Sequence, residues 1–514
     1  MSTQERSMNC NDFNLYTHFR THMEARAGKE FLCTGEGRSI SYEEADQNAA
    51  KYAQFLSDLG AEPGDRISVQ VEKSPDCLFL YLGCLRAGLV FHPLNPGYRK
   101  GELDYFLHNA EPTFVVCDPT NLDVISPIAR SAGARHAFTL DATGRGTLYD
   151  GACNTDPGFD TIPREPNDLA ALLYSSGTTG VPKGIMLTHA NLLRNTEALV
   201  AAWGFTQNDR LLHALPIFHV HGLFVAIGCA LMSGASMRWL QSYDARQVIR
   251  FLPECTVFMG VPTYYTRLLS DPSFTDEVTA NIRLFVSGSA PLLQETFDEF
   301  ESRTGHRILE RYGMTETNMN TSNPLDGLRK AGTVGPPLPD VDVRIVDDNG
   351  VQICSGEIGN IQVRGPNVFI GYWKMPEKTA EDFTEDGFFN TGDKGQIDND
   401  GYVTIVGRAK DLVITGGLNV YPKEIEQFID GIDGVKESAI IGVPHADFGE
   451  GVVAVVVPAA GHQLVEQDIV GACKNDLASF KVPKGVVIVD ELPRNAMGKV
   501  QKNVLRESYR DLLS

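Results

Sequence analysis

The sequence predicts an α/β fold, in which a large N-terminal domain of βαβ units carries a β subdomain and is followed by a small α+β C-terminal domain. Three observations favour this organisation. The chain has 514 residues, which allows about three compact units. Short β-rich runs alternate with helical stretches, and the pattern changes near residue 335. Apolar residues make up 42% and charged residues 22% of the chain, as in ordinary globular proteins.

The first part of the chain alternates strand-like and helix-like segments. Arg66–Val71 and Thr113–Cys117 are rich in β-formers, whereas Tyr42–Leu59 has a helical pattern. This alternation is typical of βαβ units around a mostly parallel sheet. We expect the large domain to span residues 1–409.

The sequence pattern changes between about residues 335 and 407, where short strand-like segments are separated by polar turns. Asp347–Gly350 and Asp398–Gly401 are examples of these turns. Such spacing predicts a small β subdomain. After Arg408 a new series of strand-like and helix-like segments begins, so we place the C-terminal domain at residues 410–514.

The charge balance argues against polyanionic partners. Lys and Arg number 45 against 66 Asp and Glu, which gives a net charge of −21. A field of this sign repels nucleic acid and anionic lipid, so neither is expected as a partner. A basic segment from Lys481 to Arg510 is the local exception. No oligomeric state can be read from the sequence.

The cysteines and the N-terminus favour a cytoplasmic protein. Ten cysteines are scattered without a CxxC pair or a Cys/His ligand spacing, so neither a disulfide framework nor a zinc site is expected. The N-terminal segment lacks the apolar stretch of a signal peptide. The longest apolar run, Gly222–Met232, is too short to span a bilayer.

A glycine-rich loop carries most of the functional information. Tyr174–Gly184 reads YSSGTTGVPKG, after the apolar run Leu169–Leu173. Its glycines allow backbone N–H groups to face a phosphate, and its hydroxyls and Lys183 add donors and one charge. It is not a Walker A loop, because Lys183 follows Gly180 by three residues. A surface turn would have a similar composition.

The string in this loop resembles the signature of the adenylate-forming superfamily, which includes acyl-CoA synthetases, luciferases and peptide-synthetase adenylation domains. Four further matches follow in the order of that family: Arg311–Thr317, Thr391–Asp393, Gly407–Gly417 and Pro493–Lys499. The resemblance covers most of the chain. It implies ATP and CoA as co-substrates, Mg²⁺ as cofactor, and an acyl-AMP intermediate.

The resemblance also implies an ATP site and a metal ligand. Tyr312 would offer a face to adenine, Asp393 would accept from ribose hydroxyls, and Glu316 would bind Mg²⁺. Taken alone, Tyr312 could be a core residue and Glu316 an exposed carboxylate. The full set of expected ATP-binding residues is Thr178, Thr179, Lys183, Ser289, Ala290, Pro291, Arg311, Tyr312, Gly313, Met314, Thr315, Asp393 and Arg408.

The C-terminal motifs imply a mobile lid. Lys499 matches the lysine that the family brings to the reacting carboxylate, and it is our expected catalytic residue. Lys410 occupies the position of the family's hinge. Gly416 and Gly417 resemble the loop that turns toward CoA, although a plain turn has the same composition. A surface role for Lys499 is the alternative if the motif is ignored.

The residues between these motifs indicate which acid is used. His221, Arg267, Ser289 and Met314 are the expected acyl contacts, and a buried Arg requires an anion. The substrate would then be a small dicarboxylic acid. These strings resemble those of the malonyl-CoA synthetases, which implies malonate or methylmalonate as substrate.

Several alternatives stay open. Arg267 could be a surface arginine, and His219 and His221 could serve the core or a gate. Asn318 and Pro336–Pro337 depart from the malonyl pattern and leave the pocket width open. A medium-chain or aromatic monocarboxylic acid is the alternative substrate. Other classes are an adenylation domain that serves a separate carrier protein and an inactive binding protein.

Overall fold

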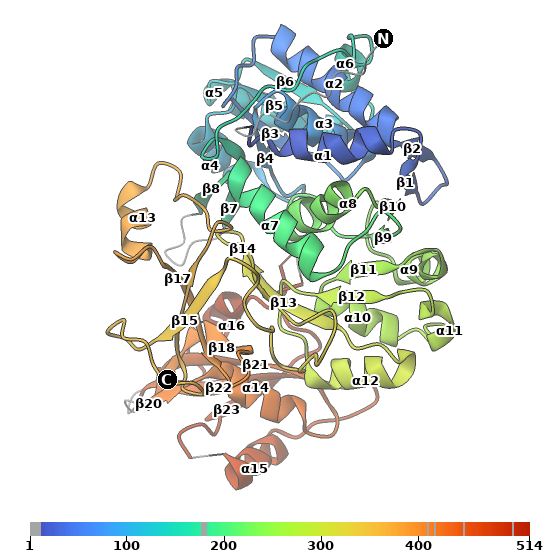
Figure 1. Ribbon diagram of the computed structural model, residues 1–514. Coiled ribbons are helices and arrows are strands. Elements are labelled where there is room, and N and C mark those ends of the chain that lie inside the picture. Colours follow the sequence, from blue (N-terminus) through green and yellow to red (C-terminus); the bar gives the residue numbers. More distant parts are fainter. Residues whose placement is uncertain are drawn as a thin grey trace.

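The computed structural model describes residues 12–175, 182–408, 411–415, 418–445, 448–477, 479–495 and 498–513. The strands of this part of the chain form four sheets (Figure 1). Two large sheets belong to the N-terminal region, one antiparallel sheet follows them, and the last lies near the C-terminus. The predicted α/β fold, with its large N-terminal and small C-terminal parts, is confirmed.

The first sheet has the order β6-β5-β3-β4-β7-β8 and is parallel apart from the β7–β8 pair. Its strands are β3 (Arg66–Gln70), β4 (Val90–Pro93), β5 (Phe114–Cys117), β6 (His136–Thr139), β7 (Leu169–Ser175) and β8 (Lys183–Thr188). The predicted strands near Arg66 and Thr113 are therefore confirmed as β3 and β5. The continuous apolar run of β5 fits a strand buried on both faces, whereas β3 alternates polar and apolar residues although most of its side chains are buried.

The second sheet has the order β14-β13-β12-β11-β9-β10-β1-β2, with antiparallel strands only at its two edges. Its strands are β1 (Glu30–Thr34), β2 (Ser39–Ser41), β9 (Arg210–His213), β10 (Ser236–Trp239), β11 (Val257–Gly260), β12 (Leu284–Ser287), β13 (Leu309–Met314) and β14 (Asn318–Ser322). The carboxyl ends of β9 to β12 meet at one edge, where ligands bind in open α/β sheets.

The third sheet is the predicted β subdomain and is wholly antiparallel. Its strands in spatial order are β15 (Asp342–Val346), β16 (Gly359–Arg364), β17 (Phe389–Ile397) and β18 (Val403–Arg408). The predicted turns Asp347–Gly350 and Asp398–Gly401 close on backbone hydrogen bonds from Gly350 N to Asp347 O and from Gly401 N to Asp398 O. Strand β17 pairs with β18 so that Asp393 lies opposite Arg408.

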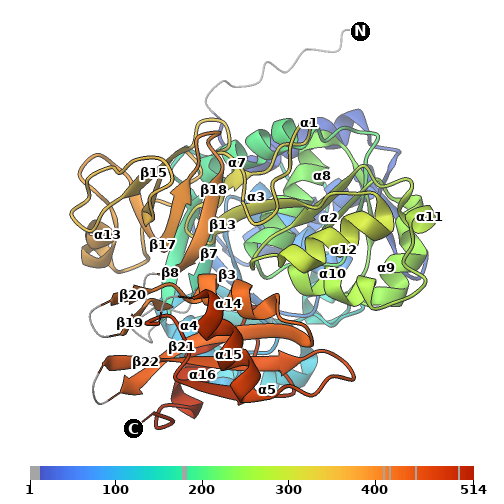
Figure 2. The same cartoon turned by 90° about the horizontal axis from the view of Figure 1, so that it is seen from below.

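The fourth sheet belongs to the C-terminal part, which forms a separate unit beside the β subdomain (Figures 1 and 2). Its strands are β19 (Val413–Thr415), β20 (Leu418–Val420), β21 (Val435–His445), β22 (Gly449–Pro458) and β23 (Gly485–Ile488). Its helices are α14 (Pro422–Asp430), α15 (Glu466–Asp476) and α16 (Lys502–Ser508). Separate apolar clusters on the two faces of this sheet give it its own core.

Helices cover both large sheets, and α7 and α8 lie between them (Figure 1). The helices of the N-terminal region are α1 (Leu15–Ala25), α2 (Tyr42–Asp58), α3 (Pro75–Arg86), α4 (Lys100–Ala110), α5 (Leu122–Ser131), α6 (Thr147–Ala152), α7 (His189–Ala202), α8 (Ile227–Ser233), α9 (Ala245–Phe251), α10 (Pro262–Leu269), α11 (Asp276–Thr279), α12 (Gln294–Thr304) and α13 (Pro376–Asp382). A six-residue π-helix, His221–Ala226, precedes α8. The described residues also form two short 3₁₀ helices, Pro119–Asn121 and Leu252–Glu254.

Local sequence explains the best-predicted helix. Helix α2 begins after Ser41, whose hydroxyl accepts a hydrogen bond from Glu44 N at 3.0 Å. The acidic residues Glu43 and Glu44 in its first turn complement the helix dipole. Its apolar face is buried at Tyr42, Ala45, Ala49, Ala50, Tyr52, Ala53 and Leu56. The prediction of a helix from Tyr42 to Leu59 is confirmed to within one residue.

Candidate active site

The carboxyl edge of the second sheet collects polar groups from several loops. Ser289 follows β12 and has a φ of +71°, a left-handed conformation that is rare for serine. Its hydroxyl lies 3.3 Å from Nδ1 of His221, at the start of the π-helix. Burial lowers the pKa of His221 well below its usual value and that of His219 to about 4. Both rings are therefore neutral near pH 7.

A second cluster joins β13 to the β subdomain. The Tyr312 hydroxyl donates to Oδ2 of Asp393 at 2.5 Å, and Nε of Arg408 lies 2.7 Å from Oδ1. Asp393 is buried, whereas Tyr312 and Arg408 are partly exposed. The charge of Asp393 raises the pKa of Arg408. The structure thus brings three of the predicted ATP-binding residues together.

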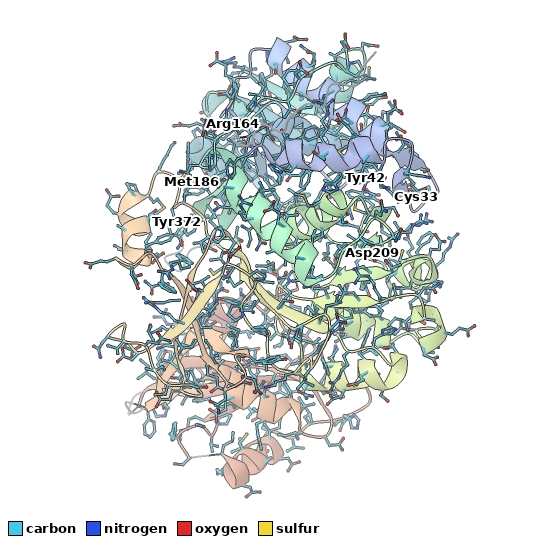
Figure 3. All side chains as sticks on the ribbon, viewed as in Figure 1. Cys33, Tyr42, Arg164, Met186, Asp209 and Tyr372 are labelled. Atoms are coloured by element: carbon cyan, nitrogen blue, oxygen red, sulfur yellow. The ribbon has the colours of Figure 1, made fainter. Side chains whose placement is uncertain are left out.

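Lys183 and Ser175 are described residues of the predicted phosphate loop, and both make contacts with other segments. Nζ of Lys183 donates to the Tyr372 hydroxyl at 3.0 Å, lies 4.1 Å from the centre of that ring, and is 3.6 Å from a carboxylate oxygen of Asp382. Figure 3 labels Tyr372 near Met186 of β8, on the side of the β subdomain. Oε1 of Glu316 accepts from the Ser175 hydroxyl at 3.3 Å. The predicted residues Thr178 and Thr179 lie outside the described residues.

Glu316 has the surroundings of a metal ligand. The side chain is buried, and burial raises the pKa of its carboxyl, while the charges of Arg408 and Lys183 act in the opposite direction. A single buried carboxylate can bind a divalent ion that ATP phosphates also hold, because Mg²⁺ in nucleotide sites usually takes only one or two carboxylates. The residues present therefore fit Mg²⁺.

The other predicted nucleotide-binding residues form an accessible strip beside these clusters. Ser289 and Ala290 are half-buried, as are all residues from 312 to 315, and Pro291 is exposed. Gly313, Met314 and Thr315 thus lie in reach of a ligand. Arg311 differs from them, because its side chain is only 3% exposed.

Lys499 approaches this edge from the C-terminal part. A turn formed by Asn495 and Lys499 holds it, with Lys499 N donating to Oδ1 of Asn495 at 2.9 Å. The next residue back, Gly498, lies so close to α10 that a Cβ there would be 3.0 Å from Oγ1 of Thr263. The Lys499 side chain is exposed. The predicted hinge Lys410 and the predicted CoA contacts Gly416 and Gly417 lie outside the described residues.

Arg267 lies at the surface rather than within a closed pocket. Its side chain on α10 is exposed, and its charge acts on the stacked rings of Tyr243 and Tyr264, whose centroids are 3.8 Å apart. These two rings line a cavity of about 210 Å³. Arg267 itself does not line this cavity, and its acyl contact stays a prediction.

The cavity lies between the first sheet and the strand ends of the second. Its walls are largely apolar and include Val69, Phe91, Leu94, Ile217, Tyr243 and Tyr264. Lys73, which also lines it, is a residue that the sequence analysis missed, together with its partner His213. No motif marks either residue, because their contact joins positions 140 residues apart.

Comparisons with known proteins place the chain in a family. The model of the AMP-binding enzyme family matches residues 19–373, and that of the AMP-binding enzyme C-terminal domain matches residues 424–499. A relative in Arabidopsis thaliana, described as a malonate–CoA ligase, is 35% identical over 92% of this chain and 85% of its own length.

Two solved structures of MatB from Rhodopseudomonas palustris are similar over 98% of this chain and 100% of their own, at 53% identity. The TM-score is 0.96 for the form with ATP bound and 0.84 for the apo form. The arrangement of the present chain is thus closer to the ATP-bound form. No helix among the described residues is long and apolar enough to cross a membrane.

Proposed function

The chain belongs to the AMP-binding enzyme family, and on that premise we propose that it is an ATP-dependent ligase that converts malonate to malonyl-CoA. The observation that carries this choice of acid is the pair of polar side chains, buried His221 and half-buried Ser289, at the strand ends where a fatty acid would require apolar walls. The similarity to the malonate–CoA ligase of Arabidopsis thaliana supports it.

The reaction has two half-reactions. In the first, a carboxylate oxygen of malonate attacks the α-phosphorus of ATP, a new O–P bond forms, and pyrophosphate leaves. In the second, the CoA thiol gives up its proton, its sulfur attacks the acyl carbonyl carbon, and AMP leaves with the electron pair of the C–O bond. Because two anions meet in the first step, the site must supply cations and oriented donors.

The described residues can supply these groups. Tyr312 and Ser289–Pro291 would hold adenine, and Asp393, already oriented by Tyr312 and Arg408, would accept from ribose hydroxyls. Lys183 would bind the phosphates together with Thr178 and Thr179, which lie outside the described residues, and Thr315 would lie at the α-phosphate. Mg²⁺, held by Glu316 and the phosphates of ATP, would neutralise negative charge on the pyrophosphate.

The C-terminal part would act as the mobile lid. Lys499 would bring its ammonium group to the reacting carboxylate and α-phosphate, and its position beside α10 supports this role. A rotation at Lys410 would then remove Lys499 and bring Gly416 and Gly417 toward CoA. The large domain would end near residue 409, and the lid would comprise residues 410–514.

A monocarboxylic acid is the second candidate. The apolar walls of the cavity of about 210 Å³ favour it, since an aromatic ring or a short alkyl chain could occupy such a space. Methylmalonate differs from malonate by one methyl group, worth about 1 kcal/mol, so the same site could accept both. In either case the partners are an acid, ATP and CoA. The nine free cysteines described support a reducing compartment, and we propose the cytoplasm.

A pyrophosphate-release assay tests the proposal. Malonate, methylmalonate, succinate, acetate, benzoate and octanoate are each supplied with ATP and Mg²⁺, with and without CoA. We expect malonate or methylmalonate to have the highest kcat/KM, with AMP and a CoA thioester as products. Preference for octanoate or benzoate would overturn the choice of acid, and ADP as product would overturn the whole reaction.

A further inference from the structure

Asp382 is a half-buried acid beside Lys183, and none of the matched sequence strings includes it. Its Oδ2 lies 3.6 Å from Nζ of Lys183. The Lys183 side chain is 12% exposed and that of Asp382 is 20% exposed. Among the described residues, Asp382 is the only acid that forms an ion pair with Lys183. A lysine with so little contact with water needs a negative partner, and Asp382 supplies it.

Tyr372 connects the two members of this pair. Its hydroxyl accepts a hydrogen bond from Nζ of Lys183 at 3.0 Å, and its ring centre lies 4.1 Å from the same atom. Burial, nearby carboxylate charges and a hydrogen bond with Asp382 raise the pKa of Tyr372. The hydroxyl therefore accepts from Lys183 and donates to Asp382. This arrangement holds the ammonium and the carboxylate beside one another.

Backbone contacts hold Tyr372 and α13 against β8, the strand on which Lys183 lies. Gly184 O accepts a hydrogen bond from Trp373 N at 2.7 Å. Oγ1 of Thr379, on α13, accepts from Tyr372 N at 2.9 Å. The last residue of α13 is Asp382. The position of this carboxylate is thus fixed by a helix that is tied to the edge of the first sheet.

Lys183 also lies near the groups that we expect at the phosphates of ATP. It pairs with Ser175 across the β7–β8 ladder, and the Ser175 hydroxyl donates to Oε1 of Glu316 at 3.3 Å. Burial raises the pKa of Glu316, and the charge of Lys183 opposes this shift. The ammonium can therefore pair with Asp382 or with a phosphate group that enters beside Glu316.

Asp382 keeps a second cation when Lys183 leaves it. Its Oδ1 lies 3.0 Å from Nζ of Lys378, one helical turn earlier. Because a partly exposed ion pair contributes little free energy, and because Lys378 still balances the carboxylate, separation of Lys183 from Asp382 is easy. The several negative charges of a triphosphate are then sufficient to take the ammonium over.

We propose that Asp382 is a counter-ion that competes with ATP and with pyrophosphate for Lys183. It is a positioning residue, which holds the ammonium near the phosphate loop before ATP binds and takes it back when pyrophosphate leaves. The competition weakens the binding of both ligands and speeds the release of pyrophosphate. This inference rests on the proposed function, in which Lys183 binds the phosphates.

Asp382→Asn tests the competition, because it keeps the size of the side chain and removes its charge. The Kd of ATP, measured by calorimetry with Mg²⁺ but without acid or CoA, should fall about 3- to 5-fold. The inhibition constant of pyrophosphate should fall by a similar factor, and KM for malonate should change less than about 1.5-fold. A merely structural role for Asp382 predicts weaker binding instead.

Matched variants make this result specific. Asp382→Glu keeps the charge and should bind ATP as wild type does. Glu377→Gln removes an exposed charge from the first turn of the same helix, so it controls for long-range repulsion of the phosphates and should change Kd less than about 1.5-fold. When Lys183→Met is already present, Asp382→Asn should have no larger effect than Glu377→Gln, because the competition requires the ammonium.

Several outcomes would overturn the inference. Equal tightening by Asp382→Asn with and without Lys183 would show direct repulsion between Asp382 and the phosphates, and equal tightening by Glu377→Gln would show a general field. Weaker ATP binding in a folded Asp382→Asn protein would also contradict it. Asp382→Ser removes the same charge and replaces the Asn variant if that one does not fold. If wild type does not bind ATP, the proposed function fails first, so the two failures are distinguishable.

Discussion

Nζ of Lys73 lies 2.7 Å from Nδ1 of His213 in the interior of the N-terminal region. It also lies 2.9 Å from the carbonyl oxygen of His213 and 2.6 Å from that of Leu240, and 4.2 Å from the centre of the Trp239 ring. Burial lowers the pKa of Lys73. Three acceptors nevertheless require three N–H donors, which favours the ammonium form.

This contact also fixes the neighbouring ring. Because Nδ1 of His213 accepts from Lys73, Nε2 carries the proton, and it lies 3.0 Å from the carbonyl oxygen of Gly222. Gly222 follows His221 in the π-helix. Lys73 is therefore a positioning residue, which links the loop after β3 to the segment that presents His221.

Replacing Lys73 by Met should destabilise the protein, because it leaves buried acceptors unpaired. We expect the free energy of unfolding to fall by about 1–3 kcal/mol. KM for the acid should rise more than KM for ATP. Thermal unfolding and steady-state kinetics measure both effects, with Lys474→Met, at an exposed site, as control. Loss of stability without any change in the ratio of the two KM values would assign Lys73 a structural role alone.

Glu310 should make stability depend on pH. Burial raises the pKa of this carboxyl from 4.5 to about 7, so between these values the folded chain holds a proton that the unfolded chain releases. Stability should therefore fall as the pH rises through this window, by about 3 kcal/mol in total.

The variant Glu310→Gln can still accept the hydrogen bond from Leu292 N but does not titrate. Its melting temperature should exceed that of wild type at pH 8 by more than at pH 5. Exposed Glu385→Gln is the control. A constant difference across this pH range would show that Glu310 is not the group that titrates.

Asp393→Asn should weaken ATP binding, because the variant loses the charge that orients Tyr312 and pairs with Arg408. Hydrogen bonds to charged groups contribute about 1.5–3 kcal/mol, so KM for ATP should rise about 10- to 100-fold. Exposed Asp490→Asn should leave it unchanged. If KM for ATP is unchanged while the melting temperature falls, Asp393 serves only as a partner in a structural ion pair.

Lys499→Ala should slow malonyl-AMP formation about 10²- to 10⁴-fold, the effect of removing one oriented charged group from a transition state. Thioester formation from presynthesised malonyl-AMP and CoA should continue at a near wild-type rate. Lys484→Ala, in the same basic segment, is the control. Equal loss in both half-reactions would contradict a role confined to adenylation.

Gly498→Ala should disfavour the arrangement in which Lys499 lies beside α10. Gly498 has a φ of +73° and would bring its new Cβ to 3.0 Å from Thr263. Adenylation should fall about 10-fold, whereas thioester formation should persist. Gly461→Ala introduces similar strain, at a φ of +82°, in open space. If it slows adenylation equally, strain rather than the contact with Thr263 is responsible.

Sequence patterns were sufficient to predict the helices and strands whose residues are determined by local sequence. The helical pattern from Tyr42 to Leu59 predicts α2, and runs rich in β-formers predict β3 and β5. The matched strings predict that Tyr312 and Asp393 both belong to an ATP site, and their hydrogen bond was found only in the structure.

Other features depend on pairing between distant segments. The register of β12 against β13 determines that Gly288 faces Arg311, and no local pattern encodes this register. The exposure of Arg267 likewise follows from which face of α10 packs on the core. A motif names the residues of a site, but strand register and helix rotation determine which of them point into it.

The close approach of Gly288 and Arg311 links the residue type at position 288 to the place of the Arg311 guanidinium. A side chain at position 288 would place its Cβ 2.3 Å from Cζ of Arg311 and would therefore require the guanidinium to move. We expect Gly288→Ala to shift this buried cation rather than the paired strands, because the end of an arginine side chain moves more easily than backbone. In an engineered enzyme, position 288 is thus a place from which the Arg311 charge can be moved without replacing Arg311 itself.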